Sequence, residues 1–459
     1  MNGAEALADQ PLSPIDSTFW HLETADHPMH LGALAVLQPS ARQGRDPGRR
    51  IAELIAERTA AMPRLRRRVQ DVWYPPGALG WAEDRGFDVH RHVERIVLGG
   101  DPAERDEITA ELMAQPLDRD RPPWAAYVLA GRRRGDQVHV LLKLHHALAD
   151  GLGAVEIGAG LMDQIQDLLP APRTAPPVPA AGGPNPLALA TGLLHTADPR
   201  SLPARIRYAG RQLGIGAAVL RTAIEGGSPL LAAPTSGTRA LATAELDLDD
   251  ITRIRKIVRG TANDVLIAVV AGALRRWLLD GGADRAELAS AAPRALIPVS
   301  RRRRRQGVGN LLSGYLIRLP LGEPDPLVRL ETVRTAMDRC KAAGTNGGAG
   351  AVALLAEPLP PALRRAGAPL AGRGARLLFD VLLTSVPLPD IPLSLGGAPL
   401  RALYPLPPLA RGHALAIAMS TYRGRAHIGV LADGRSSPDP RALPAALAAE
   451  LSAVLAAVR

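Results

Sequence analysis

The segment LLKLHHALADG, residues 141–151, places two adjacent histidines, His145 and His146, at the end of an apolar run. The run that starts at Val138 alternates as a strand does, so His146 falls on a wholly apolar side and His145 on the side that carries Lys143. A neutral imidazole is the usual proton acceptor near neutral pH. A desolvated His146 at the edge of a dry interior would therefore be able to take a proton from an alcohol or a thiol.

The run closes with Asp150 and Gly151, which should turn the chain into one helix bearing apolar residues as far as Leu169. Asp150 would hold this turn by pairing with an arginine or with backbone N–H groups. Two structural histidines followed by an ordinary turn would fit the same spacing equally well. Because the two histidines point apart, we expect no metal site. The sequence also lacks the G-x-S-x-G, P-loop and G-x-G-x-x-G motifs of hydrolases and of nucleotide-binding proteins.

The elements that must position this motif mix helices and strands without strict alternation, which indicates layered α/β architecture. Asn263 stands where a helix N-cap would, at the start of an apolar helical pattern. Helical spacing is found at residues 51–61, 263–280 and 443–458. Strand-like runs are found at residues 138–146, 295–300, 377–384, 415–422 and 426–431.

A Pro/Ala-rich segment, PAPRTAPPVPAAGGPNP, separates two globular stretches. Its prolines exclude a packed helix or a central strand. The chain of 459 residues is also too long for one ordinary core. We therefore expect an N-terminal domain at residues 1–170 that carries the histidine motif, a crossover linker at 171–235, and a C-terminal domain at 236–459.

Composition narrows the class of protein further. The net charge of +10 comes from arginine, with only three lysines and no basic stripe interleaved with aromatic residues, so we expect no nucleic-acid partner. The single cysteine, Cys340, favours a reducing compartment. We expect a cytoplasmic protein, soluble or peripheral, because no signal peptide and no apolar run near the ~18 residues that span a bilayer is evident. The five arginines at residues 301–305 indicate a solvated loop, or a contact for anionic lipid or for a ligand's phosphates.

The residues HHALADG complete an HHxxxDG motif, and they resemble the active-site signature of the acyltransferase superfamily that includes chloramphenicol acetyltransferase and the condensation domains of peptide synthetases. The rest of the chain is similar, in order, to the bacterial wax ester synthase/acyl-CoA:diacylglycerol acyltransferase family. The similar segments are PLSPIDSTFWHLETADHPMHLGALAVL (11–37), PRLRRRV (63–69), WAEDRGFDVHRHV (81–93), PLDRDRPPWAAYVLAG (116–131), TANDVLIAVVAGALRRWL (261–278), PVSRR (298–302), VGN (308–310) and the Gly424 hairpin that ends in LADG.

This resemblance implies two chloramphenicol-acetyltransferase-like domains, each a mixed sheet with helices, joined by a long crossover. A channel between them would hold both substrates. The resemblance also implies that His146 is the catalytic general base, that His145 is its supporting neighbour, and that Asp150 and Gly151 form the structural end of the motif.

Five further positions follow from the same resemblance. Asn263 and Asp264 match the family's Asn-Asp pair and would lie near the reaction centre as substrate-binding residues, although an asparagine at a helix start is most often simply a cap. The segment TSVPLP departs from the family pattern, with Ser385 where an asparagine is usual and Leu388 where a glycine is usual. Ala416 replaces another usual asparagine. These differences, in the half expected to line the channel, bear on substrate preference and activity.

The function implied is that of an O-acyltransferase. It would move a fatty acyl group from acyl-CoA to a long-chain alcohol or diacylglycerol, giving wax ester or triacylglycerol without a covalent intermediate. Acyl-CoA would be a co-substrate, no cofactor is expected, and the enzyme would work in the cytoplasm, with contact to the inner membrane face or to lipid droplets. Two alternatives stay open: acyl transfer to a secondary metabolite or a carrier-bound acyl group, and a lipid-binding protein with weakened catalysis.

Overall fold

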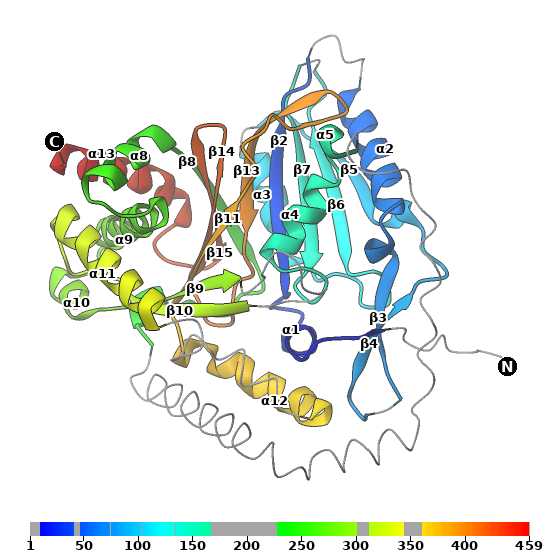
Figure 1. Cartoon of the computed structure of the whole chain (residues 1–459), viewed down its shortest axis with the longest axis horizontal. Coiled ribbons are helices and arrows are strands. Elements are labelled where there is room, and N and C mark those ends of the chain that lie inside the picture. The colour runs from blue at the N-terminus through cyan, green and yellow to red at the C-terminus, as the bar shows by residue number, and fades with distance from the viewer. Residues whose placement is uncertain are drawn as a thin grey trace.

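The computed structural model describes residues 10–40, 46–166 without residues 74, 102 and 134, 227–300, 312–343 and 360–458. Most of the expected crossover and the arginines at 301–305 lie outside these described residues. The described chain forms two six-stranded sheets and one three-stranded sheet, together with helices (Figure 1). This mixed architecture confirms the expected α/β class.

The first six-stranded sheet carries the histidine motif. Its strands, in spatial order, are β12 (Ser394–Leu395), β13 (Ala398–Leu406), β2 (His30–Leu37), β7 (Val138–His145), β6 (Trp124–Ala130) and β5 (Val93–Val97). All neighbours are antiparallel except β5 and β6. Strands β2 and β7 pair along their whole length, from His30 opposite His145 to Leu37 opposite Val138. Because both faces of these strands are covered, their sequences are almost continuously apolar.

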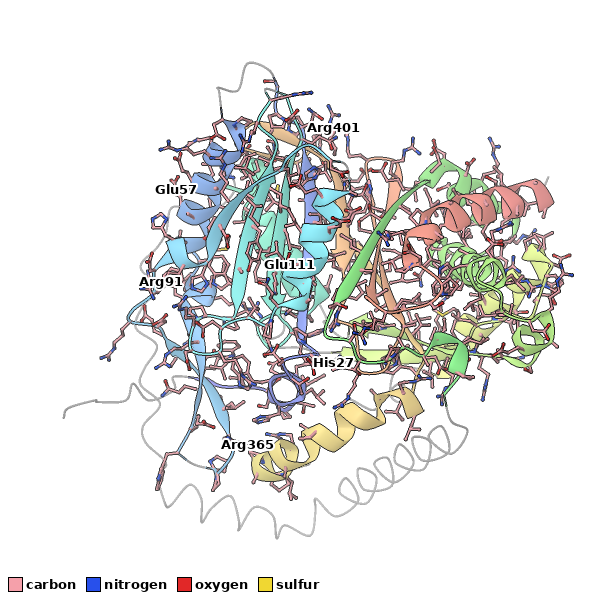
Figure 2. The ribbon with its side chains drawn as sticks, turned by 180° about the vertical axis from the view of Figure 1, so that it is seen from behind. His27, Glu57, Arg91, Glu111, Arg365 and Arg401 are labelled. Atoms are coloured by element: carbon pink, nitrogen blue, oxygen red, sulfur yellow. The ribbon has the colours of Figure 1, made fainter. Side chains whose placement is uncertain are left out.

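Helices cover both faces of this first sheet (Figure 1). The helices of this half are α1 (Pro14–Leu22), α2 (Pro47–Ala60), α3 (Glu104–Ala114), α4 (Gly151–Ala159) and α5 (Asp163–Gln166). The face that carries Val140 and Leu142 packs against α2 and α4. The opposite face, which carries Leu141, packs against α3, the helix marked by Glu111 in Figure 2.

A small sheet accompanies α1. Its strands, in spatial order, are β1 (Gln10–Pro11), β4 (Leu79–Glu83) and β3 (Arg67–Asp71). Ser13 begins α1 as its N-cap, accepting the N–H of Asp16 at 3.2 Å, and Glu23 ends the helix. Helix α1 thus lies beneath the ends of β2 and β7 that carry His30 and His145 (Figure 1).

The second six-stranded sheet lies between the first sheet and a layer of helices (Figure 1). Its strands, in spatial order, are β10 (Leu312–Arg318), β9 (Arg294–Ser300), β11 (Val381–Pro387), β14 (Leu415–Tyr422), β15 (Arg425–Asp433) and β8 (Arg239–Asp247). The helices of this half are α8 (Leu248–Ile257), α9 (Ala262–Asp280), α10 (Arg285–Ser290), α11 (Pro326–Ala343), α12 (Pro361–Gly374) and α13 (Leu443–Ala457). In β14, Ile417 and Met419 pack into the helical layer, whereas Ala416 packs toward the first sheet.

Strands β12 and β13 connect the two halves. They follow β11 in the chain but belong to the first sheet, where β13 pairs with β2. Asp163 of α5 holds the turn between them, because its carboxylate accepts the N–H groups of Gly396 and Gly397 at 3.0 and 2.9 Å. The domain limits stay a prediction, and these strands show that the C-terminal stretch contributes to the N-terminal sheet.

The helix predicted after Asp150 is interrupted. Helix α4 ends at Ala159, and a turn through Leu161 and Met162 separates it from α5. The N–H of Gly160 closes α4 by donating to the carbonyl of Glu156 at 3.0 Å. The prediction of one continuous helix was therefore wrong. Leu161 and Met162 are buried although they lie in a turn, so the apolar spacing continues where the helix does not.

The prediction that Asn263 caps its helix was also wrong. Helix α9 begins at Ala262 and Thr261 is its N-cap. The Thr261 hydroxyl accepts the N–H of Asp264 at 3.2 Å, and the Asp264 carboxylate accepts the N–H of Thr261 at 2.8 Å. This reciprocal capping box satisfies two N–H groups at once, which a cap at Asn263 would not. The strand predicted at residues 377–384 begins only at Val381, because residues 375–377 form a 3-10 turn.

One described helical segment, Pro440–Ala457, is long and apolar enough to cross a membrane by length and composition, contrary to the expectation from the sequence. It comprises α13 and the turn before it. Leu447, Leu451 and Val454 pack into the core of the second half. Buried Glu450 pairs with Arg329 of α11. These contacts place one face of α13 against the core of the second half.

Candidate active site

A cavity of about 200 Å³ lies against the first sheet, and both halves of the chain contribute its walls. Its lining is mainly aliphatic, and the polar side chains of His146, Asp150, Thr384 and Ser385 also belong to it. Strand β2 contributes Leu31, Ala33, Ala35 and Leu37, β7 contributes Val140 and Leu142, and α4 contributes Ala154, Val155 and Gly158. From the second half come residues of β11 and of the hairpin β12–β13, including Leu393, Leu395 and Leu403. The cavity therefore offers an apolar space between the two halves.

His146 lines this cavity, directly after β7. Its ring stacks on Phe19, with centroids 4.0 Å apart and planes inclined by 23°. Its backbone N–H donates to the carbonyl of Met29 at 2.8 Å. Burial lowers the pKa of His146 to about 4, an effect to which His145 adds and which Asp150 opposes. The imidazole is therefore neutral at neutral pH and can act as a proton acceptor.

His145 has different surroundings, as the alternation of the strand predicted. The residue is 1% exposed and does not line the cavity. Its Nδ1 accepts the N–H of Ala147 at 3.0 Å, and its Nε2 lies 3.4 Å from Oε2 of Glu23. Trp20 meets the ring edge-on, with centroids 4.8 Å apart. His145 is thus buried between Ala147, Glu23 and Trp20, which suits a supporting role.

Asp150 and Gly151 form the start of α4. Asp150 is its N-cap, and its buried carboxylate accepts the N–H of Gly153 at 2.7 Å. This bond confirms the expectation that Asp150 holds the turn through backbone N–H groups. Gly151 lines the cavity, and a Cβ at this position would lie 3.7 Å from Val386. The pair therefore fixes the helix that forms one wall.

The segment TSVPLP, residues 384–389, lines the cavity along its whole length, as expected. Ser385 and Leu388 both belong to the lining, so the two departures from the family pattern change the wall itself. Ala416 is different. It is 1% exposed, packs between Leu382 and Leu431 in the sheet, and is not a lining residue, whereas Ala418 is. Ala416 and Ala418 lie on the same face of β14, and only Ala418, two residues farther along the strand, reaches the cavity.

Asn263 and Asp264 do not occur among the described residues that line the cavity. Asp264 is buried in the capping box of α9, and its Oδ1 lies 3.6 Å from Nζ of Lys341. Asn263 occupies the first turn of the same helix. Their role as substrate-binding residues stays a prediction.

Several partners of the motif were not predicted. Phe19, Trp20 and Glu23 come from α1, which sequence spacing does not relate to the histidines. Lys143 is another: it is fully buried, and its Nζ donates to the carbonyls of Leu112, at 2.6 Å, and of Gln115 at the end of α3. Burial lowers the pKa of Lys143 to about 7. A lysine within an apolar strand was the one visible signal, since such a residue must find polar partners.

Among the described residues, no group of three or more histidine, cysteine, aspartate or glutamate side chains is arranged to hold a metal ion.

Family comparisons match almost the whole chain. The model of the wax ester synthase/diacylglycerol acyltransferase catalytic domain matches residues 12–266, and the model of the WS/DGAT C-terminal domain matches residues 308–454. A Mycobacterium tuberculosis protein named "Probable diacyglycerol O-acyltransferase tgs1" is 30% identical over 434 residues, covering 92% of this chain and 90% of its own. Another from that species, named "Probable diacyglycerol O-acyltransferase tgs2", is 29% identical over 457 residues, covering 96% and 97%.

Solved structures share the fold. The wax ester synthase/diacylglycerol acyltransferase from Marinobacter aquaeolei VT8 matches with a TM-score of 0.70 and 22% identity, covering 98% of this chain and 99% of its own. The starter condensation domain of rhizomide synthetase RzmA matches with a TM-score of 0.57 and 15% identity, covering 99% and 93%. These likenesses confirm the expected pair of chloramphenicol-acetyltransferase-like domains.

Proposed function

Because the chain belongs to the wax ester synthase/diacylglycerol acyltransferase family, we propose that it moves a fatty acyl group from acyl-CoA to a long-chain alcohol or to diacylglycerol. The products would be wax ester or triacylglycerol. The observation that carries this proposal is the position of His146 in the wall of an aliphatic cavity built by both halves. An aliphatic wall suits two water-insoluble chains, because their burial there is favourable.

The reaction proceeds by direct transfer, with His146 as the general base. Its imidazole takes the proton of the acceptor hydroxyl while the oxygen attacks the thioester carbon. The carbon–sulfur bond then breaks, and the imidazolium returns the proton to the leaving thiolate of CoA. A ring with a pKa of about 4 is a weak base before charge develops beside it. Negative charge that develops on the reacting oxygen beside it stabilises the imidazolium in the transition state, and the mainly apolar surroundings strengthen that attraction.

The shape of the cavity suits the acyl chain of the substrate. Strand β2 lines it from Leu31 to Leu37, a distance of about 20 Å at the rise of a strand. This length suits an extended long acyl chain that starts beside His146. Small side chains at Ala33 and Ala35, with Gly158 opposite, leave room along this wall. The acyl chain would therefore lie between β2 and α4.

The wall of the cavity also bears on the acceptor. Leu388 and Ser385 change the wall of the cavity relative to the family pattern, which favours a second candidate: the same acyl transfer to a different acceptor. Because the family's acceptors and products are insoluble in water, the enzyme would meet them at the surface of the inner membrane face or of lipid droplets.

The proposal is tested by incubating the purified full chain with palmitoyl-CoA and each of several acceptors. Hexadecanol, dioleoylglycerol and a panel of hydroxylated metabolites would serve as acceptors, with CoA release and the lipid product both measured. The expected result is ester formation with hexadecanol or dioleoylglycerol. Ester formation confined to another acceptor would support the second candidate, and lipid binding without turnover on any acceptor would refute both.

A further inference from the structure

Helix α1 contacts both histidines of the motif within one helical turn. Phe19 stacks on the ring of His146, and Trp20 meets the ring of His145 edge-on. Glu23, which ends the helix, brings its Oε2 to 3.4 Å from Nε2 of His145. One short segment near the start of the chain therefore borders both imidazoles.

The contacts of His145 assign its tautomer. Nδ1 accepts the N–H of Ala147 at 3.0 Å, so this nitrogen carries a lone pair. In the neutral ring the proton then lies on Nε2. Nε2 is the nitrogen that faces Glu23, at 3.4 Å from Oε2, so the carboxylate lies beside the protonated nitrogen and favours this orientation of the ring.

Glu23 is also linked to the backbone of His146 through Met29. The same oxygen, Oε2, accepts the N–H of Met29 at 2.9 Å, and the carbonyl of Met29 accepts the N–H of His146 at 2.8 Å. One carboxylate therefore orients the ring of His145 and anchors the backbone from which His146 projects.

The charge on Glu23 and the anchoring of α1 make this arrangement firm. Burial raises the pKa of Glu23, but the contacts with His145 and with the N–H of Met29 outweigh burial and leave the pKa below its ordinary value. The carboxylate is therefore ionised at neutral pH. Arg119 fixes the end of α1 from outside, since its guanidinium lies 4.3 Å from the centroid of the Trp20 ring and donates to the carbonyl of Trp20 at 2.9 Å.

We propose that Glu23, together with Phe19, is a positioning residue for His146. It holds the ring of His145 and the backbone at the end of β7 in place. This orientation turns the ring of His146 toward the acceptor hydroxyl. Glu23 does not line the cavity, so it acts through the histidines and not on the reactants. The effect on turnover rests on the proposed function, whereas the effect on the histidine rings does not.

The kinetic test compares Glu23→Gln with Glu104→Gln. Glutamine keeps the size of the side chain and an acceptor for Met29 but removes the charge that faces His145. Glu104 is a matched control, because its carboxylate likewise accepts backbone N–H groups, those of Gly99 and Gly100, and it lies partly exposed outside the cavity. We expect kcat of Glu23→Gln to fall about 10- to 100-fold, as misplacement of a reacting group costs, with KM for palmitoyl-CoA close to wild type.

A second variant protects this test against a folding defect. Phe19→Leu keeps apolar volume beside His146 but removes the stacked ring. It should also lower kcat while KM for palmitoyl-CoA stays close to wild type. Thermal melting of each variant checks that it is folded. Equal kcat values for Glu23→Gln and Glu104→Gln in an active enzyme would overturn the proposal.

Nitrogen NMR of protein with 15N-labelled histidine tests the same contacts without turnover. The signal of His145, assigned by its loss in His145→Gln, should report a proton on Nε2 in the wild type and a mixed or exchanging tautomer in Glu23→Ala. A proton on Nδ1 in the wild type, or no change in the variant, would overturn the positioning role. If the spectra are as expected but the protein turns over no acceptor, the proposed function is refuted while the positioning contacts are supported.

Discussion

The charge of one imidazole determines how the reaction should depend on pH. Because burial holds the pKa of His146 at about 4, its neutral form persists far below the ordinary value of 6.5. The neutral form is the base, so kcat/KM should stay level from about pH 8 to about pH 5 and fall as the pH drops through about 4. A pH profile of CoA release, with tryptophan fluorescence to check folding at each pH, measures this. A half-maximal rate near pH 6.5 would contradict the assignment.

At the same scale, the sequence predicted one part of the site and missed another. Strand alternation correctly separated His146, on the apolar side, from His145, because side-chain direction in a strand is a local property. The contacts of Phe19 and Glu23 with these rings could not be predicted. They depend on where α1 lies relative to the end of β7, and no periodicity records that placement.

Helix α4 offers a test of the cavity as an acyl-chain site. Gly158 lines the cavity, and no atom lies within 4 Å of the position that a Cβ would take there. Gly158→Leu should therefore fill the cavity without a clash at Cβ, while a better helix former stabilises α4 by about 1 kcal/mol or less. We expect an unchanged or higher melting temperature and a shift in preference from palmitoyl-CoA toward shorter acyl-CoA.

Gly367→Leu is the matched control for this substitution. Gly367 lies in α12, its Cβ position is also open, and it does not line the cavity. It should leave the preference for acyl length unchanged. Equal preferences in Gly158→Leu, Gly367→Leu and wild type would show that the acyl chain lies elsewhere.

The same elements show what apolar patterns can and cannot specify. The pattern at residues 415–422 predicted β14 with its bounds, because alternation and turn residues agree there. The helix after Asp150 was predicted too long, since apolar spacing does not reveal the turn at Gly160. Asn263 was mistaken for a cap because asparagine favours that position generally, while Thr261 and Asp264 together make a better one.

The fold of the whole molecule depends on keeping several histidines neutral. Burial lowers the pKa of His27, His139 and His146 to about 4. Below the ordinary value of 6.5 the unfolded chain binds protons that the native chain does not, so the free energy of unfolding should decrease as the pH falls from about 6.5 to about 4. Urea unfolding at several pH values measures this decrease.

Two variants separate this effect from general acid sensitivity. His139→Leu, which places an apolar residue beside Val36 and Leu129 in the sheet, should lessen the pH dependence. His90→Leu removes an exposed histidine and should leave the dependence unchanged. A urea midpoint that does not vary between pH 6.5 and 4 would contradict this explanation.

At the scale of the molecule, the sequence indicated two α/β halves but not how they share strands. Long-range pairing is not written in local periodicity, so the place of β13 beside β2 could not be predicted. That exchange brings Leu395 and Leu403 to the cavity wall.

The most direct test of the account is the steady-state rate of CoA release by His146→Ala relative to His90→Ala, with palmitoyl-CoA and the best acceptor. His90 is an exposed histidine outside the cavity, so its removal controls for any general effect of losing an imidazole. We predict that kcat falls by about 10²- to 10⁴-fold in His146→Ala, the usual contribution of a general base, and is unchanged in His90→Ala. Equal turnover by the two folded variants would contradict the role of His146.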